Sequence, residues 1–174
     1  LGETEAAALS RRQEAPNVVN VLAGDVIRAL PNANAAEAAG RLPGVSTERD
    51  EGEGKFVQIR GTEPRLTDVT IDGAHVPGTE KGNRIPKLDD VPSDILSAIE
   101  VSKTLTADMD ADAIGGSVNL VTKTPTGAPT GYVSGQYGQI TLLNRDQYQG
   151  GFAYGGRFGT DRKLGLLLGG SADR

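Results

Sequence analysis

An abrupt change in composition near residue 130 most limits the folds open to this chain. The first 130 residues carry 13 basic and 20 acidic side chains, whereas the last 44 carry 5 basic and 3 acidic ones. Glycine is concentrated in the last part, which holds 11 of the 24 glycines. The stretch TPTGAPTG at residues 124–131 combines proline and glycine, which interrupt regular structure, and indicates a linker. One uniform fold is therefore excluded, and the chain is divided into two regions.

Short runs separated by turn residues predict a compact α+β domain in the first region. β-type runs occur at residues 17–22, 45–49, 55–60, 67–71, 74–76, 99–103 and 117–123. The two runs on either side of DEGEG predict a hairpin. The pair Asp72-Gly73 predicts a tight turn between the runs that flank it.

Helices are predicted in the same region, at residues 3–14, 25–30 and 35–42. Asn34 followed three residues later by Glu37 is typical of a helix start. A further helix is expected at residues 92–99, because proline suits a first helical turn and three apolar residues follow at helical spacing. These three residues are Ile95, Leu96 and Ile99.

The last region shows the alternation of β-strands. In residues 147–158, four aromatic side chains share one parity, namely Tyr148, Phe152, Tyr154 and Phe158, and the residues of the other parity are polar or small. Further strands are predicted at residues 132–140 and 164–171. Strands of about ten residues with aromatic side chains near their ends are typical of a transmembrane β-barrel wall. A soluble meander with one buried face has the same alternation, so periodicity leaves both open.

The composition excludes several classes of protein. The chain has no cysteine and one histidine, which excludes disulfides, thiolate metal sites and the common zinc sites. A formal charge of -5 argues against binding of nucleic acid through a basic surface. No stretch reaches the roughly 18 apolar residues of a transmembrane helix. The N-terminus lacks a signal peptide, so the protein is cytosolic or its start is missing.

No motif for catalysis or for a cofactor stands out. The sequence has neither the GxSxG turn of a serine hydrolase nor the GxxxxGK[ST] loop of a nucleotide-binding protein. Asp108, Asp110 and Asp112 alternate as in a calcium loop. The sixth and twelfth positions of that loop are Ala113 and Asn119, where calcium binding requires glycine and glutamate. We therefore expect no enzyme activity, no catalytic residue, no metal and no cofactor.

An ordered series of short motifs runs through the first region: LPGV, IRG, DG, IEV and GGSVN. In this order, and at these spacings, residues 17–125 resemble the plug domain of TonB-dependent outer-membrane receptors. The resemblance implies that residues 1–16 are a mobile extension and residues 126–131 a linker. It implies that residues 132–174 are about the first three strands of a transmembrane barrel of about 22 strands. Because three strands leave open edges that lipid does not tolerate, the chain is expected to be a fragment of a longer protein.

The family resemblance also implies a function and partners. It predicts an active transporter in the outer membrane of a Gram-negative bacterium, which takes up a scarce ligand such as a siderophore or an oligosaccharide. TonB and its inner-membrane motor would deliver energy through an N-terminal segment that is missing here. The plug would lie in the barrel lumen with its N-terminus in the periplasm, and the barrel would contact outer-membrane lipid.

Roles for individual residues follow from the resemblance and from local chemistry. Arg60 of IRG and Lys103 after IEV are expected to contact the barrel wall. Turns or close backbone approaches that favour glycine are expected at Gly44, Gly61, Gly73, Gly115 and Gly116. Substrate-facing loops are expected to carry Arg65, His75, Glu80, Lys81, Asn83 and Arg84. Lipid is expected to contact Tyr148, Phe152, Tyr154 and Phe158.

An autonomous soluble module that binds a ligand or glycan stays open as the alternative. It predicts that the aromatic side chains of residues 147–158 are buried against the first region. The transporter predicts that they face lipid and are exposed in this chain.

Overall fold

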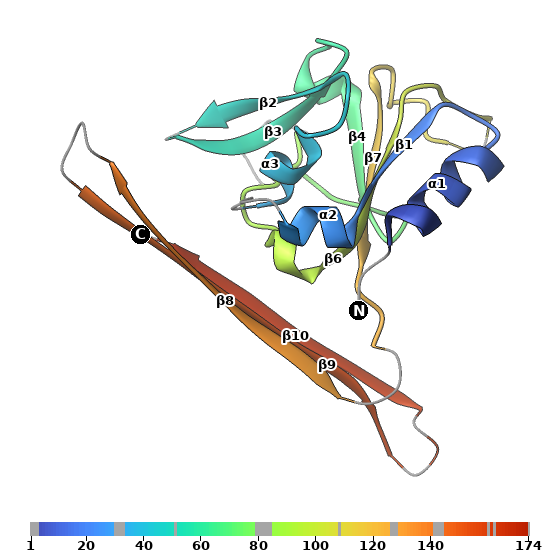
Figure 1. The fold of residues 1–174 in the computed structure, drawn as a ribbon. Coiled ribbons are helices and arrows are strands. Elements are labelled where there is room, and N and C mark those ends of the chain that lie inside the picture. The colour runs from blue at the N-terminus through green and yellow to red at the C-terminus, as the bar shows by residue number, and fades with distance from the viewer. Residues whose placement is uncertain are drawn as a thin grey trace. The chain divides into compact units, whose positions relative to one another are not determined.

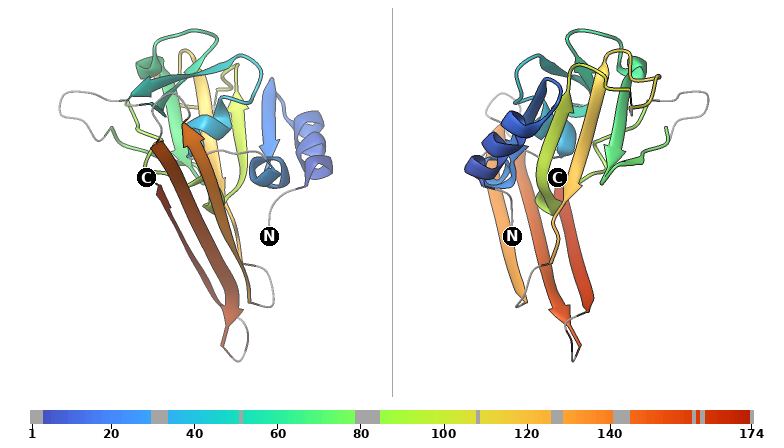
Figure 2. Two further views of the ribbon diagram at one scale, coloured as in Figure 1. Left: turned by 60° about the vertical axis from the view of Figure 1, so that its left-hand side comes forward. Right: turned by 90° about the vertical axis from the view of Figure 1, so that its right-hand side faces the viewer.

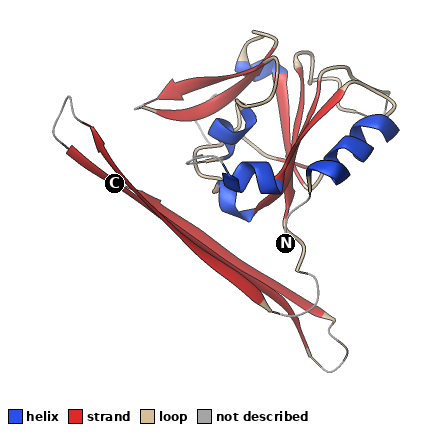
Figure 3. Cartoon of the chain, in the orientation of Figure 1, coloured by secondary structure: helices blue, strands red, loops and turns tan. Residues whose placement is uncertain are grey.

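The computed structural model describes residues 4–29, 34–50, 52–78, 85–107, 109–125, 129–140, 145–159, 161 and 163–173 (Figure 1). The chain divides into two compact units, Gly2–Thr122 and Lys123–Arg174. The first unit combines helices and strands, and the second consists of antiparallel strands (Figure 3). This is the fold class that the sequence predicts.

A five-stranded sheet forms the centre of the first unit. Its order is β1 (Val19–Ala23), β6 (Leu96–Ser102), β7 (Gly116–Thr122), β4 (Thr67–Ile71) and β5 (Ala74–His75). β4 and β7 are parallel, and the other neighbours are antiparallel. Between β4 and β5, Asp72 and Gly73 have φ angles of 51° and 81°, as the predicted tight turn requires.

Short helices pack against this sheet. They are α1 (Glu5–Glu14), α2 (Gly24–Ala29) and α3 (Ala35–Ala39), close to the predicted positions. At the start of α3, Asn34 Oδ1 accepts a hydrogen bond of 3.0 Å from the backbone nitrogen of Glu37, which confirms the predicted cap. Figure 2 shows α1 beside β1. Within the described part of the chain, every helix is too short or too polar to cross a membrane.

The predicted hairpin is also present. β2 (Val45–Asp50) and β3 (Glu53–Ile59) pair antiparallel and form a sheet of their own. A 3-10 turn, η1 (Pro64–Leu66), then leads into β4. The loop between β3 and β4 therefore carries Arg60 and Arg65 close to the start of a central strand.

The helix predicted at residues 92–99 is wrong. The structure has a single 3-10 turn, η2 (Ser93–Ile95), followed directly by β6. A β-bulge shifts the register between Leu96 and Ala98. The bulge places Leu96 and Ile99 in the same core, although residues three apart in a regular strand point to opposite faces. The helix-like spacing of these apolar residues is therefore produced by an irregular strand.

The main core lies on one face of the sheet. Its largest side chains are fully buried and come from β3, β6, β7 and residue 88, namely Ile59, Leu88, Leu96, Ile99 and Leu120. Four buried alanines of α3 complete this core, because small side chains let a helix approach closely. A smaller cluster on the other face joins Ala8 of α1 to Val21 and Ala98.

The second unit is a three-stranded antiparallel sheet. Its order is β10 (Leu164–Asp173), β9 (Arg145–Phe158) and β8 (Thr130–Ile140). All three strands overlap the predicted ones and are longer. Thr130 and Gly131, predicted as linker, lie in β8, where they pair with Gly155 and Tyr154.

Candidate functional site

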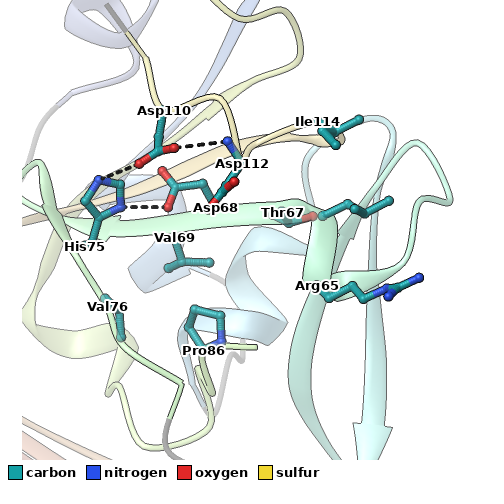
Figure 4. Close-up of a pocket in the computed structure, with 11 residues that line it drawn as sticks. Arg65, Thr67, Asp68, Val69, His75, Val76, Pro86, Asp110, Asp112 and Ile114 are labelled. Carbon is teal, nitrogen blue, oxygen red and sulfur yellow. Dashed lines mark hydrogen bonds and ion pairs between the residues drawn. The ribbon is translucent and has the colours of Figure 1, made fainter. Parts of the chain in front are cut away.

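A cavity of about 640 Å³ lies in the first unit beside β4 and β5 (Figure 4). η1 supplies Arg65, the two strands supply Asp68 and His75, and the loop before β7 supplies Asp110, Asp112 and Ile114. Two residues predicted to face substrate, Arg65 and His75, therefore line one cavity. Four others predicted with them, Glu80, Lys81, Asn83 and Arg84, lie outside the described residues.

His75 connects two sides of this cavity. Its Nδ1 lies 2.9 Å from Asp68 Oδ1 on the neighbouring strand, and its Nε2 lies 3.5 Å from Asp110 Oδ2 on the loop. The hydrogen bond and charge of Asp68 raise the pKa of His75, and the charges of Asp110 and Asp112 add to this effect. Only the protonated imidazole donates from both nitrogens, so the bridge between strand and loop is complete only in that form.

Arg65 has a local partner. Its Nε donates to Glu63 Oε2, and both side chains are about two-thirds exposed. Such exposed pairs contribute little to stability. The guanidinium is therefore available at the cavity rim for a further interaction.

The two residues predicted to contact the barrel wall are linked through the backbone of Lys103. The Arg60 guanidinium donates to the backbone oxygens of Lys103 and Gly115, which lie at the two ends of the loop between β6 and β7. The backbone nitrogen of Arg60 also donates to the Gly44 oxygen at 2.8 Å. Arg60 has a φ of 55°, which is uncommon for a residue with a side chain. These contacts lie within the first unit, and contact with a barrel stays a prediction.

Glycine is required most clearly where β7 begins. Gly116 has a φ of 136°, and a Cβ there would lie 2.6 Å from the Ser102 oxygen and 2.7 Å from Ile59 Cδ1. A Cβ on Gly115 would lie 2.3 Å from Thr62 Oγ1. The other three predicted turn glycines, Gly44, Gly61 and Gly73, have φ angles of 72°, 74° and 81°.

The acidic loop is stabilised by its own backbone. Asp110 Oδ1 accepts from the backbone nitrogen of Asp112 at 3.0 Å, while its other oxygen faces His75. Asp108 lies outside the described residues. Over the described ranges, no three acidic, histidine or cysteine side chains are grouped so as to hold a metal ion.

The second unit presents an apolar face. In β9, Tyr148, Phe152 and Tyr154 are 56%, 50% and 44% exposed, and Phe158, of the same parity, is partly buried. The strand register places Tyr137 and Val133 opposite the first two, and Leu168 opposite Tyr154. All seven side chains lie on one face because residues of one parity share a face of a strand.

The opposite face of β9 is polar or small, and the residues that pair with it include Tyr132 of β8 and Leu167 of β10. Across the three strands, one row contains Ser134, Gly151 and Ser171, and a second contains Gln136 and Gln149. At one end of the apolar face the rings of Tyr137 and Tyr148 are 5.4 Å apart, and the Tyr137 hydroxyl donates to Asp146 Oδ1 at 2.9 Å. The aromatic band thus ends where hydrogen-bonding groups begin.

Sequence reasoning did not predict the hydrogen bonds that several polar residues make across the central sheet. Asp72 accepts hydrogen bonds from the backbone nitrogen and hydroxyl of Thr122, at 2.9 and 2.6 Å. Glu100 and Asn119 bond to each other across β6 and β7 at 3.0 Å. In the sequence, Glu100 and Asn119 are marked only as single polar residues between apolar neighbours, Ile99 and Val101 in β6 and Val118 and Leu120 in β7.

Comparisons with known proteins agree with this geometry. Residues 11–117 match the family described as TonB-dependent Receptor Plug Domain. The curated ferric enterobactin receptor PirA of Pseudomonas aeruginosa is 30% identical over 128 residues, which cover 66% of this chain and 17% of that receptor. A second ferric enterobactin receptor of the same organism is 30% identical over 71% of this chain and 19% of its own length.

Solved structures show the same fold. The ferric citrate transporter FecA superposes with a TM-score of 0.75 at 26% identity, over 99% of this chain and 27% of FecA. The siderophore receptor PirA of Acinetobacter baumannii gives a TM-score of 0.69 at 23% identity, over 96% of this chain and 26% of that receptor. The chain therefore spans less than a third of the length of these relatives. Because the family match covers more than half of its residues, and includes all of β1, β4, β5 and β6, this chain belongs to the TonB-dependent receptor plug domain family.

Proposed function

We propose that this chain is the plug and the first barrel strands of a TonB-dependent receptor that imports a scarce ligand across the outer membrane. The observation that carries the proposal is the plug-family match over residues 11–117, followed directly by an amphipathic sheet. The curated relatives that match this chain are receptors, and the solved relatives include a transporter.

The apolar face has the dimensions that a membrane requires. Tyr148 and Phe158 are ten residues apart in β9, which corresponds to about 33 Å along a strand. A tilt of about 40° reduces this to about 25 Å across the membrane, the usual height of the apolar band of an outer-membrane barrel. The exposure of Tyr148, Phe152 and Tyr154 on one face of their own sheet supports contact with lipid.

The cavity beside β4 and β5 is the proposed plug contribution to ligand binding. Its side chains combine the Arg65 cation with hydrogen-bonding groups on His75 and Asp68. The named ligands of the relatives are ferric enterobactin and ferric citrate. We therefore propose a ferric siderophore or similar iron chelate as ligand, with the remaining contacts supplied by barrel loops.

Transport follows from coupling between ligand binding and the plug. A ligand that binds two plug states with different affinity changes their populations. In the proposed cycle, this change presents the N-terminal segment to TonB in the periplasm, and TonB pulls on the plug. The cycle consists of binding and mechanical work, and no covalent chemistry is required of the chain.

The test uses the product of the complete gene. We expect a heat-modifiable band in the outer-membrane fraction, with a mass several times that of this chain. We also expect iron uptake that depends on TonB. The matched control is the same strain without TonB. A soluble product that ends near Arg174 would contradict the proposal and favour a soluble binding module.

A further inference from the structure

The two faces of the central sheet differ in chemistry. One face packs Leu120, Ile99 and Val118 into the main core. The other face carries a polar row at one level of three adjacent strands, because Glu100 of β6 pairs with Asn119 of β7, and Asn119 pairs with Thr70 of β4. Thr70 is buried, and Glu100 and Asn119 are partly buried. Polar side chains in such positions are stable when they bond to one another.

Asn119 occupies the centre of this row. Its Nδ2 donates to Glu100 Oε2 at 3.0 Å. Its Oδ1 accepts from Thr70 Oγ1 at 2.9 Å and from the backbone nitrogen of Gly73 at 3.1 Å. The orientation of the amide is determined by its partners, since a carboxylate only accepts and a backbone nitrogen only donates. One side chain therefore joins β6 to the turn between β4 and β5.

Glu100 extends the row to the N-terminal helix. Its other oxygen, Oε1, accepts from Arg11 Nη1 of α1. Ala8 is the buried residue of this helix, and the backbone nitrogen of Glu5 donates to Asp25 Oδ2 at 3.2 Å. A second arginine, Arg12, donates to the backbone oxygen of Val21 in β1 at 2.7 Å. This bond attaches the helix to β1 independently of Glu100.

We propose that Asn119 couples the docking of α1 to the conformation of the β4–β5 turn, through the bonds Arg11–Glu100–Asn119–Gly73. Asn119 holds the Glu100 carboxylate in the orientation that Arg11 requires, so the rotamer entropy of Glu100 is lost before α1 docks. Conversely, Arg11 holds Glu100 where it keeps the Asn119 amide directed at the turn. Such coupling acts equally in both directions.

This coupling has a consequence that rests on the proposed function. His75, in β5, lines the cavity, and its strand begins one residue after Gly73. α1 is the first element of the described chain, and in the proposed function TonB pulls on the plug from its N-terminal side. A pull that undocks α1 would release Glu100 and loosen the turn that holds one wall of the cavity. Asn119 would thus be a positioning residue for ligand release.

The first test compares two neighbouring arginines by amide hydrogen exchange in the complete 174-residue chain in detergent micelles. Arg11→Ala is expected to speed exchange of the Gly73 amide about fivefold, the effect of a hydrogen bond worth about 1 kcal/mol. Arg12→Ala removes a contact of the same helix with β1 that does not pass through Glu100, and it is expected to affect Gly73 clearly less than Arg11→Ala does. No change in either variant, or equal changes in both, would overturn the proposal.

The second test runs in the opposite direction. Asn119→Ala is expected to speed exchange of the α1 amides about fivefold. The control is Ser117→Ala, on the same face of β7, whose hydroxyl bonds Asp68 at 3.4 Å. If Asn119→Ala unfolds the chain, Glu100→Gln provides the measurement at the Gly73 amide instead, because it keeps the shape and removes the charge that holds Arg11. Equal exchange in α1 for the Asn119 and Ser117 variants would overturn the coupling. The measurement requires no transport, so its failure would leave the proposed function untouched.

Discussion

The two units of this chain place their apolar residues in opposite ways. In the first unit, Ile59, Ile99 and Leu120 are fully buried in a core that the unit builds for itself. In the second, Val133, Phe152 and Leu168 are 85%, 50% and 52% exposed on one face of a three-stranded sheet. A soluble domain rarely exposes a continuous apolar face of this kind. The comparison shows that the first unit carries its own stabilising interior, whereas the three strands of the second leave one apolar face exposed.

The comparison predicts a large difference between equivalent truncations in the two units. Leu120→Ala should cost about 2–5 kcal/mol of unfolding free energy, because it leaves a cavity in a closed core. Leu168→Ala, on the exposed face, should change the stability of the first unit by less than about 0.5 kcal/mol. Denaturant unfolding in detergent, monitored with a probe in the first unit, measures the unfolding free energy of both variants. Similar losses would show that the apolar face of the second unit is part of the same core.

A charge on the apolar face should be nearly as damaging, but only in a membrane. Phe152→Lys in the complete protein is expected to cost about 2–4 kcal/mol of barrel stability, because a lysine near the middle of a membrane is poorly solvated. Ser171→Lys lies at almost the same level on the opposite face, since Ser171 pairs with Gly151, and should be tolerated. Heat-modifiability of outer-membrane fractions distinguishes the two. Equal tolerance of both lysines would contradict the assignment of this face to lipid.

A backbone test compares glycines of the two units. Gly116→Ala should destabilise the first unit by about 2–3 kcal/mol, because it combines a strained φ with a close contact. Gly135→Ala in β8 has no atom within 4 Å of the added Cβ and should be nearly neutral. Thermal unfolding of the two variants provides the comparison. A neutral Gly116→Ala would show that the start of β7 relaxes more easily than its packing indicates.

Arg60 tests the proposed link between the plug and the barrel. Arg60→Ala removes the bonds to the Lys103 and Gly115 oxygens and should cost about 1–2 kcal/mol in the first unit. In the complete receptor it is expected to weaken plug seating as well, seen as faster protease cleavage of the plug and reduced transport. Arg65→Ala, whose partner is the exposed Glu63, is the control for seating. Unchanged plug retention and transport in Arg60→Ala would contradict a role at the barrel wall.

Local patterns predicted much of the fold because many elements are specified by neighbouring residues. The Asn34 cap, the Asp72-Gly73 turn and the aromatic parity of β9 each depend on residues a few positions apart. The β-bulge in β6 could not be predicted, because its register depends on β7. The polar row through Asn119 was likewise hidden, since it joins residues 19 and 46 positions apart in the sequence. The ordered motifs were enough to predict a plug domain by family resemblance, whereas the contacts between the motifs could be seen only in the structure.

The smallest expected effect concerns the pH dependence of the first unit through His75. Its pKa is raised above the usual value of about 6.5 by Asp68 and, more weakly, by Asp110 and Asp112. A raised pKa in the folded state means that the stabilisation is fully present below about pH 6.5 and is lost as the pH rises through the raised value. Because His75 is exposed, the change in stability should be small, and the titration itself is the sharper measurement.

An NMR titration of the His75 ring should therefore give a midpoint above 6.5, and Asp68→Asn should lower it more than Asp110→Asn. This order follows from the two distances, since Asp68 hydrogen-bonds the ring at 2.9 Å and Asp110 lies 3.5 Å away. Above the midpoint the neutral ring donates from one nitrogen, so the loop that carries Asp110 loses its bond to β5 while Asp68 can keep its own. Above this midpoint, the amides of residues 109–113 should exchange with solvent faster than the higher pH alone explains. His75→Gln should remove this excess exchange. A midpoint at or below 6.5, or an unchanged excess in His75→Gln, would show that the loop is held by its own backbone and not by the histidine.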